Sequence, residues 1–113
     1  MEEFNKLERE VLNWIKNHNK DKLLKNQIDS AKFIEREWTK VGYYVELEVE
    51  KIITKLELET KIIDGPFIKS AGIENCGGSI IFVEDGFIKC IEMFSYGDRF
   101  DKEILNYELT DKL

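Results

Sequence analysis

Hydrophobic and polar residues repeat with two different periods along the chain, and the change of period divides it into a helical part and a sheet part. From residue 2 to about residue 18, apolar side chains recur every three or four positions, as in an amphipathic helix. A second, shorter helix is predicted from residue 21 to about residue 30, so residues 1–30 are predicted to be helical. The first helix is expected to contribute to the core through Phe4, Val11 and Trp14.

After residue 32 the period falls to about two, which is typical of β-strands. The first predicted strand covers residues 33–38. Residues 44–50 then alternate without a break, and the apolar side of this alternation consists of Val45, Leu47 and Val49. Residues 55–60 repeat the pattern, so residues 51–54 are predicted to be the loop of a hairpin between these two strands.

The strongest strand signal lies in residues 77–96, where two runs of β-branched and aromatic residues flank Asp85-Gly86. This dipeptide supplies the positive φ angles of a two-residue type I′ turn. Such a turn predicts Val83 opposite Ile88 and Ile81 opposite Cys90. Both faces of the hairpin then carry apolar side chains, so we expect it in the interior of a sheet, where no bare edge can promote aggregation.

Helices followed by strands favour an α+β domain, with one or two N-terminal helices packed on a mostly antiparallel sheet that has the Asp85-Gly86 hairpin at its centre. We predict a single domain over residues 1–113. Its parts are a helical region up to residue 30, a sheet over residues 33–95, and a turn with a C-terminal extension over residues 96–113. The glycine-rich residues 71–78 are predicted to be a flexible loop.

Length and charge narrow the range of functions. The chain has 113 residues, with 23 acidic and 17 basic side chains and a net charge of −6. Such a surface is repelled by phosphate backbones and anionic membranes, so we expect neither nucleic-acid binding nor membrane attachment. The N-terminus lacks a signal-peptide pattern, and no run approaches the roughly 18 apolar residues of a membrane span. A cytoplasmic location is expected, with Cys76 and Cys90 as reduced thiols.

Side chains suited to catalysis or metal binding are few and scattered. His18 is the only histidine, and nothing nominates a nucleophile or an orienting carboxylate for it. Gly77-Gly78-Ser79 lacks the lysine and the following helix of a phosphate-binding loop, and no calcium-loop motif is present. We therefore predict no catalytic residue, no metal and no cofactor, and expect that the protein is not an enzyme.

The acidic side of two predicted strands is the strongest candidate for a functional surface. With a loop at residues 51–54, Glu46 lies opposite Glu59 and Glu48 lies opposite Glu57. Like charges directly opposite each other destabilise a sheet by about 0.2–1 kcal/mol per pair. An acidic surface of this kind is suited to docking a basic partner, and the alternative is that these carboxylates only face solvent.

Aromatic residues near turns and strand ends are the second candidate, because Tyr and Trp at an edge often anchor interfaces. Among them, Tyr43 and Tyr96 are the expected partner contacts. Two other functions stay open. One is a small ligand-binding domain or enzyme that uses the segment from Ser70 to Gly78, and the other is a self-associating adaptor, such as a homodimer formed through the two-faced hairpin.

Residues 77–82 (GGSIIF), the Asp85-Gly86 turn and residues 91–97, preceded by TKVGY at residues 39–43, resemble a pattern of small uncharacterised bacterial α+β proteins. Some of those proteins are immunity partners of polymorphic or contact-dependent toxins. The resemblance implies a cytoplasmic protein that neutralises a basic, nuclease-type toxin by covering its active site or substrate groove. It carries over no catalytic residue and no contact residue.

Overall fold

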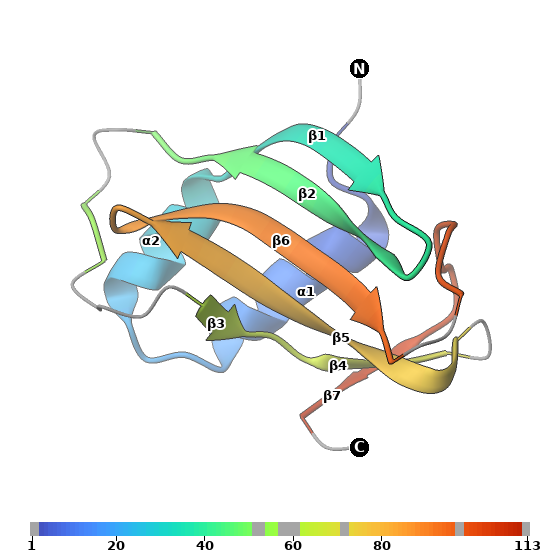
Figure 1. Cartoon of the computed structure of the whole chain (residues 1–113). Helices are drawn as coiled ribbons and strands as arrows, with labels where there is room; N and C mark the ends of the chain where they lie inside the picture. The colour runs from blue at the N-terminus through green and yellow to red at the C-terminus, as the bar shows by residue number, and fades with distance from the viewer. Residues whose placement is uncertain (1–2, 51–53, 57–61, 71–72, 97–98, 112–113) are drawn as a thin grey trace.

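The computed structural model describes residues 3–50, 54–56, 62–70, 73–96 and 99–111, and for residues 73–76 it describes the backbone alone. These residues form two helices followed by seven strands. The elements are α1 (Lys6–Asn17), α2 (Lys22–Ser30), β1 (Lys32–Trp38), β2 (Gly42–Glu48), β3 (Ile62–Asp64), β4 (Phe67–Ser70), β5 (Ile73–Glu84), β6 (Phe87–Ser95) and β7 (Glu108–Thr110). Both helices lie against one face of the sheet, which confirms the predicted α+β class (Figure 1). Neither helix is long and apolar enough to cross a membrane.

Each helix begins at a side chain that caps it. The Asn5 side chain accepts a hydrogen bond of 2.9 Å from the Glu8 backbone N–H, and the Glu8 carboxylate accepts one of 2.9 Å from the Asn5 N–H. This reciprocal capping box satisfies two backbone donors at the start of α1. Asp21 caps α2 in the simpler way, by accepting from the first-turn N–H groups. The apolar side of α1 then packs on the sheet through Leu7, Val11, Leu12 and Ile15.

The β5–β6 hairpin lies in the middle of the sheet, as predicted. The strand order is β1-β2-β6-β5-β4-β7, with β3 also paired to β5, and all these pairs are antiparallel. Asp85 and Gly86 have φ angles of 53° and 85°, the positive values that a type I′ turn requires. The turn residues therefore start the hairpin that the rest of the sheet flanks on both sides.

The pairing of this hairpin differs from the prediction beyond the turn. Val83 pairs with Ile88 as expected, but a β-bulge follows, and Ile81 pairs with Ile91 rather than with Cys90. One inserted residue exchanges the two faces of a strand. Ile91 is therefore buried in the core, and Cys90 lies on the opposite face of the sheet. The sequence does not reveal the insertion because both faces of the hairpin are apolar.

The prediction that Glu46 lies opposite Glu59, in a hairpin between residues 44–50 and 55–60, is wrong. Both edges of β2 are occupied, by β1 on one side and β6 on the other, so Glu46 lies opposite Glu35 and Cys90. Strand order depends on contacts between distant segments, which the alternation within one strand does not encode. Residues 51–53 and 57–61, and with them Glu57 and Glu59, lie outside the described residues.

The predicted loop at residues 71–78 is wrong for its larger part, because β5 begins at Ile73. Gly77 pairs with Ile68 of β4 and with Ser95 of β6, so it lies inside the sheet. In β5 the neighbouring Gly78 gives room for the Phe94 ring, so glycine here permits close packing within a strand. Residues 71 and 72 are not among the described residues.

A buried glutamine joins the helix layer to the tip of the central hairpin. The Gln27 amide donates to the carbonyls of Thr54 (3.1 Å) and Gly86 (2.8 Å), and its oxygen accepts from the Ile88 N–H (2.9 Å). The side chain is completely buried. It therefore holds three segments that are far apart in the sequence, and it keeps the end of the sheet in a single position.

Candidate functional site: the open face of the sheet

The sheet face that points away from the helices is the candidate site, and we refer to it as the open face (Figure 1). Side chains of paired residues in antiparallel strands lie on the same face, so the pairing arranges them in rows across the strands. The first row consists of Glu35, Glu46, Cys90, Phe82 and Ile62. The second row consists of Glu37, Tyr44, Glu92, Ile80 and Asp64. Phe94 extends the face beside these rows, opposite Gly78.

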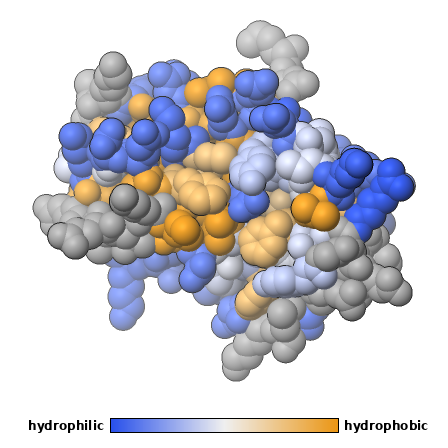
Figure 2. Space-filling model, viewed as in Figure 1, coloured by the Kyte–Doolittle hydropathy of each residue, from blue (hydrophilic) through white to orange (hydrophobic). Residues whose placement is uncertain are grey.

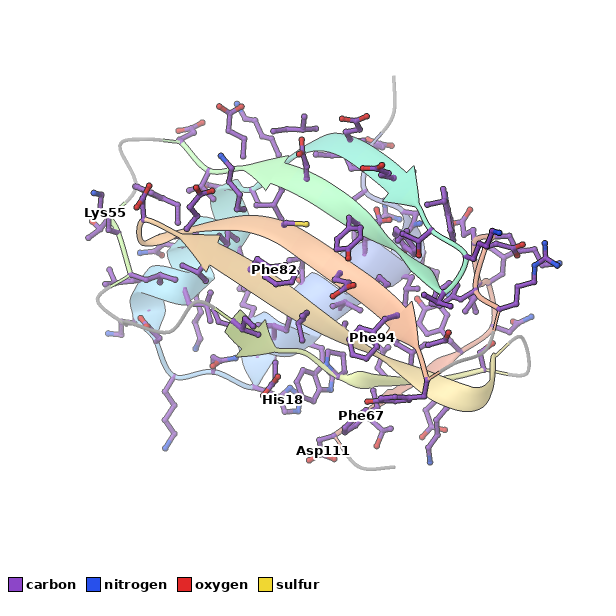
Figure 3. The ribbon with its side chains drawn as sticks, in the orientation of Figure 1. His18, Lys55, Phe67, Phe82, Phe94 and Asp111 are labelled. Carbon is purple, nitrogen blue, oxygen red and sulfur yellow. The ribbon has the colours of Figure 1, made fainter. Side chains whose placement is uncertain are left out.

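The open face has an acidic half and an apolar half. The acidic half, on β1, β2 and β6, consists of Glu35, Glu37, Glu46 and Glu92. The apolar half, on β3, β5 and β6, consists of Ile62, Ile80, Phe82 and Phe94. Figure 2 shows apolar side chains across the middle of this face, with hydrophilic ones along β1 and β2. The labelled rings of Phe82 and Phe94 lie on this side of the ribbon in Figure 3.

A like-charge pair lies at the centre of the acidic half, where Glu35 and Glu46 are directly opposite each other and both exposed. A small hollow of about 210 Å³ opens beside them and is also lined by Lys89 and Cys90. Lys89 supplies one positive charge at this hollow. Carboxylates from three strands nevertheless keep this half of the face negatively charged. Because Glu35 and Glu46 carry like charges directly opposite each other, their repulsion slightly destabilises the free protein.

The carboxylates change the acidity of their neighbours. Burial, together with the negative charges of Glu46 and Glu92, raises the pKa of the Cys90 thiol to about 11. A hydrogen bond with Glu92, and the charge of that carboxylate, raise the pKa of the Tyr44 hydroxyl. At neutral pH the Cys90 side chain is therefore a neutral thiol, which is a poor nucleophile. Within the part of the chain that the structure describes, no group of three or more His, Cys, Asp or Glu residues is placed to hold a metal ion.

The structure separates the predicted partner contacts. Glu46 and Glu48 are both exposed on β2, on the side of the alternation that faces away from the helices. Tyr96 is 47% exposed and packs edge-on against Phe94, with ring centroids 5.6 Å apart. Tyr43 is only 1% exposed, so its assignment as a surface anchor is wrong.

Tyr43 is buried because it has the same parity in β2 as Val45 and Leu47, which face the helices. Its ring packs against Trp38 and Phe100 in the core. Burial, with the Glu8 carboxylate nearby, raises the pKa of its hydroxyl far above the ordinary value. The alternation of residues 43–49 contains the signal that would have placed this side chain inside.

Sequence reasoning missed most of the acidic half. Glu35 and Glu37 alternate in the first strand, so their shared face was visible, but nothing in the sequence placed that strand beside β2. Glu92 joins them only because the bulge in the hairpin sets the phase of β6. The site is therefore assembled by strand order and by one inserted residue, neither of which the period of the sequence encodes.

Comparison with known proteins identifies no relative of this chain: no family model matches it, and neither a curated protein nor a solved structure matches it significantly. What the fold and site define is a class, an α+β protein with helices on one face of an antiparallel sheet and an open, half-acidic and half-apolar second face. These comparisons therefore assign no function, and the open face is the main basis for a proposal.

Proposed function

We propose that this protein is a binding protein that docks a basic partner protein on the open face of its sheet. The observation that carries the proposal is the pairing of Glu35 with Glu46 beside Glu92, three carboxylates from three strands on a face that no described helix covers. The fold does not need this charge, because the core lies on the other side of the sheet. Positive charge from a partner would relieve the repulsion among these carboxylates.

The two halves of the open face supply different parts of the binding. The acidic half attracts a basic surface and raises the rate of association, and this effect weakens as salt is added. The apolar half supplies area that is removed from water on contact, with Phe82 and Phe94 as its aromatic residues. Charge therefore favours encounter and selectivity, whereas the rings favour a long-lived complex.

The more specific form of the proposal is an immunity protein that neutralises a basic nuclease-type toxin by occlusion. The carboxylates of the acidic half would occupy the positions of the phosphates that such an enzyme binds, and the protein would cover its substrate groove. Two features support this form: the resemblance over residues 39–97, and the net charge of −6 on a small chain. A cytoplasmic site of action belongs to the same proposal.

Site-specific photo-crosslinking in an extract of the native organism tests the proposal. Tyr44, exposed on β2 between Glu37 and Glu92 of the acidic half, is replaced by p-benzoylphenylalanine, and the matched control carries the same residue at Glu103, which is exposed on the C-terminal segment. We expect a basic protein to be crosslinked from position 44 and not from position 103. The same protein should be lost when Glu35→Gln and Glu46→Gln are added, and if it is a nuclease its activity should fall on mixing with the wild-type chain.

Three results would contradict the proposal. The first is equal crosslinking from both positions, and the second is a partner without basic character. The third is a product that consists of two copies of this chain, which would instead favour the self-associating adaptor. Circular dichroism of each crosslinking variant should show the wild-type fold, so that a lost crosslink reports lost binding and not unfolding.

A further inference from the structure

An aromatic hollow of about 410 Å³ opens where the chain passes from β3 to β4. Four rings line it: Trp14 of α1, Phe67 of β4, Phe94 of β6 and Tyr96. The carboxylates of Asp64 and Asp111 line it as well. The labelled side chains of Phe67, Phe94 and Asp111 lie close together in Figure 3, below the end of β6. Phe94 belongs to β6 and Tyr96 directly follows that strand, so the hollow is a continuation of the apolar half of the open face.

Local packing holds the rings in place. A Cβ atom at Gly78 would lie 2.7 Å from the Phe94 ring, so only glycine lets this ring lie across β5. The Tyr96 ring meets the same Phe94 ring edge-on. On the helix side, Trp14 is stacked on His18 with centroids 3.8 Å apart, and the His18 Nδ1 lies 2.8 Å from the Trp14 carbonyl oxygen. The walls of the hollow are therefore formed before any ligand arrives.

The charges around the hollow favour a cation. The faces of aromatic rings carry negative potential, and Asp64 and Asp111 add two carboxylates. Neither carboxylate forms an ion pair with another described residue. Of the described residues that line the hollow, none is basic. The Ser79 hydroxyl donates to the Pro66 carbonyl oxygen at 2.9 Å, so it is already engaged within the protein.

Among the cations of proteins, the guanidinium group matches these walls best. It is planar, it stacks on aromatic rings, and its fork of N–H donors pairs with a carboxylate through two hydrogen bonds. A lysine ammonium lacks the planar face and the fork. The volume is also within the usual range of pockets that hold a small ligand group.

We infer that the aromatic hollow receives an arginine side chain of the basic partner, stacked on Trp14 and Phe94 and paired with Asp64. The inference rests on the proposed function for its occupant. It adds an anchor point that the acidic half lacks, because the cation is held between rings as well as attracted by charge. The partner would then present a protruding arginine beside its basic docking surface.

Short peptides test the hollow without the partner. A capped Gly-Arg-Gly peptide is titrated into the isotope-labelled full chain, and the Trp14 indole N–H signal is followed by NMR. The matched peptide contains citrulline, which has nearly the same shape as arginine but no charge, and a third peptide contains lysine. We expect saturable shifts at Trp14 with a dissociation constant on the order of 1 mM for arginine, weaker binding of lysine, and none of citrulline.

Variants then assign the binding to the hollow. Phe94→Leu and Asp64→Asn are each expected to weaken arginine-peptide binding about threefold to thirtyfold. Asp64 is exposed, so its variant should fold normally even if Phe94→Leu does not. Trp38, on the other face of the sheet, provides a second indole signal that should not move. The Glu35→Gln, Glu46→Gln double variant serves as the control for general charge loss, because it removes two carboxylates outside the hollow, and it should bind the peptide as the wild type does.

Several results would overturn the inference: no shift at Trp14, citrulline or lysine binding as tightly as arginine, or an Asp64→Asn variant that binds normally. A loss of peptide binding in the control would also overturn it, because the attraction would then come from the acidic half. The proposed function is tested separately, by whether a basic protein is crosslinked from position 44. Crosslinking without peptide binding refutes the hollow alone, and peptide binding without crosslinking refutes the docking face alone.

Discussion

Replacement of Gln27 by Met gives a sharp test of how the helix layer holds the central hairpin. The buried Gln27 amide makes three hydrogen bonds, to the carbonyls of Thr54 and Gly86 and from the Ile88 N–H. Met has a similar length and keeps the apolar contacts, but it cannot replace any of these bonds. The change therefore removes the polar contacts at nearly constant volume.

The three lost bonds are not equally costly. Thr54 is exposed, so water can take the place of the amide there, and the Gly86 carbonyl also accepts from the Leu56 N–H at 2.8 Å. The Ile88 N–H is buried and loses its partner, which costs about 1–3 kcal/mol. We therefore expect Gln27→Met to lower the free energy of unfolding by about 1–3 kcal/mol, dominated by this one donor.

Urea and thermal denaturation measure this loss. A change of 1 kcal/mol shifts the melting temperature of a domain of 113 residues by roughly 4 °C. Asn26→Met is the matched control, because Asn26 is the neighbouring residue of α2 and is exposed. Hydrogen exchange at the Ile88 amide should accelerate in Gln27→Met alone. An unchanged melting temperature together with unchanged protection of that amide would show that the Gln27 hydrogen bonds do not stabilise the hairpin.

Two further predictions concern charged and titrating groups. Arg36 contacts both carboxylate oxygens of the fully buried Glu8 at 2.7 Å, so Arg36→Met should lower the free energy of unfolding by about 3–5 kcal/mol, and an unchanged urea midpoint would contradict this. In a Cys76→Ser background, alkylation of Cys90 should be slow at pH 8 and rise with a midpoint near pH 11, because the thiolate forms only as pH exceeds its raised pKa. Adding Glu46→Gln should lower that midpoint, and a midpoint that does not move would show that the carboxylate does not act on the thiol.

The helices and the central turn could be predicted because their signals are local. The spacing of apolar residues in residues 2–18 indicates one face of a helix, and Asp85-Gly86 indicates a turn that few other dipeptides permit. The α+β class follows from the order of these signals along the chain. None of these predictions required knowledge of which segments meet.

The sheet could be predicted only in part, because pairing is a contact between distant segments. β2 pairs with β6, whose residues follow more than forty positions later, and the sequence favoured the nearer residues 55–60 instead. The bulge after Val83 was hidden because both faces of the hairpin are apolar. The candidate site could not be predicted for the same reason. Its acidic half depends on the strand order, and its aromatic hollow depends on the passage from β3 to β4.

Under the proposed function, the charge of the open face drives association with a basic partner. Its most direct test uses the crosslinked protein in purified form and measures its association rate constant at low and moderate salt. The wild-type chain is compared with Glu35→Gln, Glu46→Gln and with a control of equal charge, Glu103→Gln, Glu108→Gln, whose residues are exposed on the C-terminal segment and β7.

We expect the open-face variant to associate more slowly than the wild type and to have a flatter salt dependence, whereas the control of equal net charge keeps nearly the wild-type rate. The same variant should be as stable as the wild type or more stable by about 0.2–1 kcal/mol, because the repulsion between the facing carboxylates is removed. Equal rates and equal salt slopes for all three proteins would show that the acidic half does not drive association.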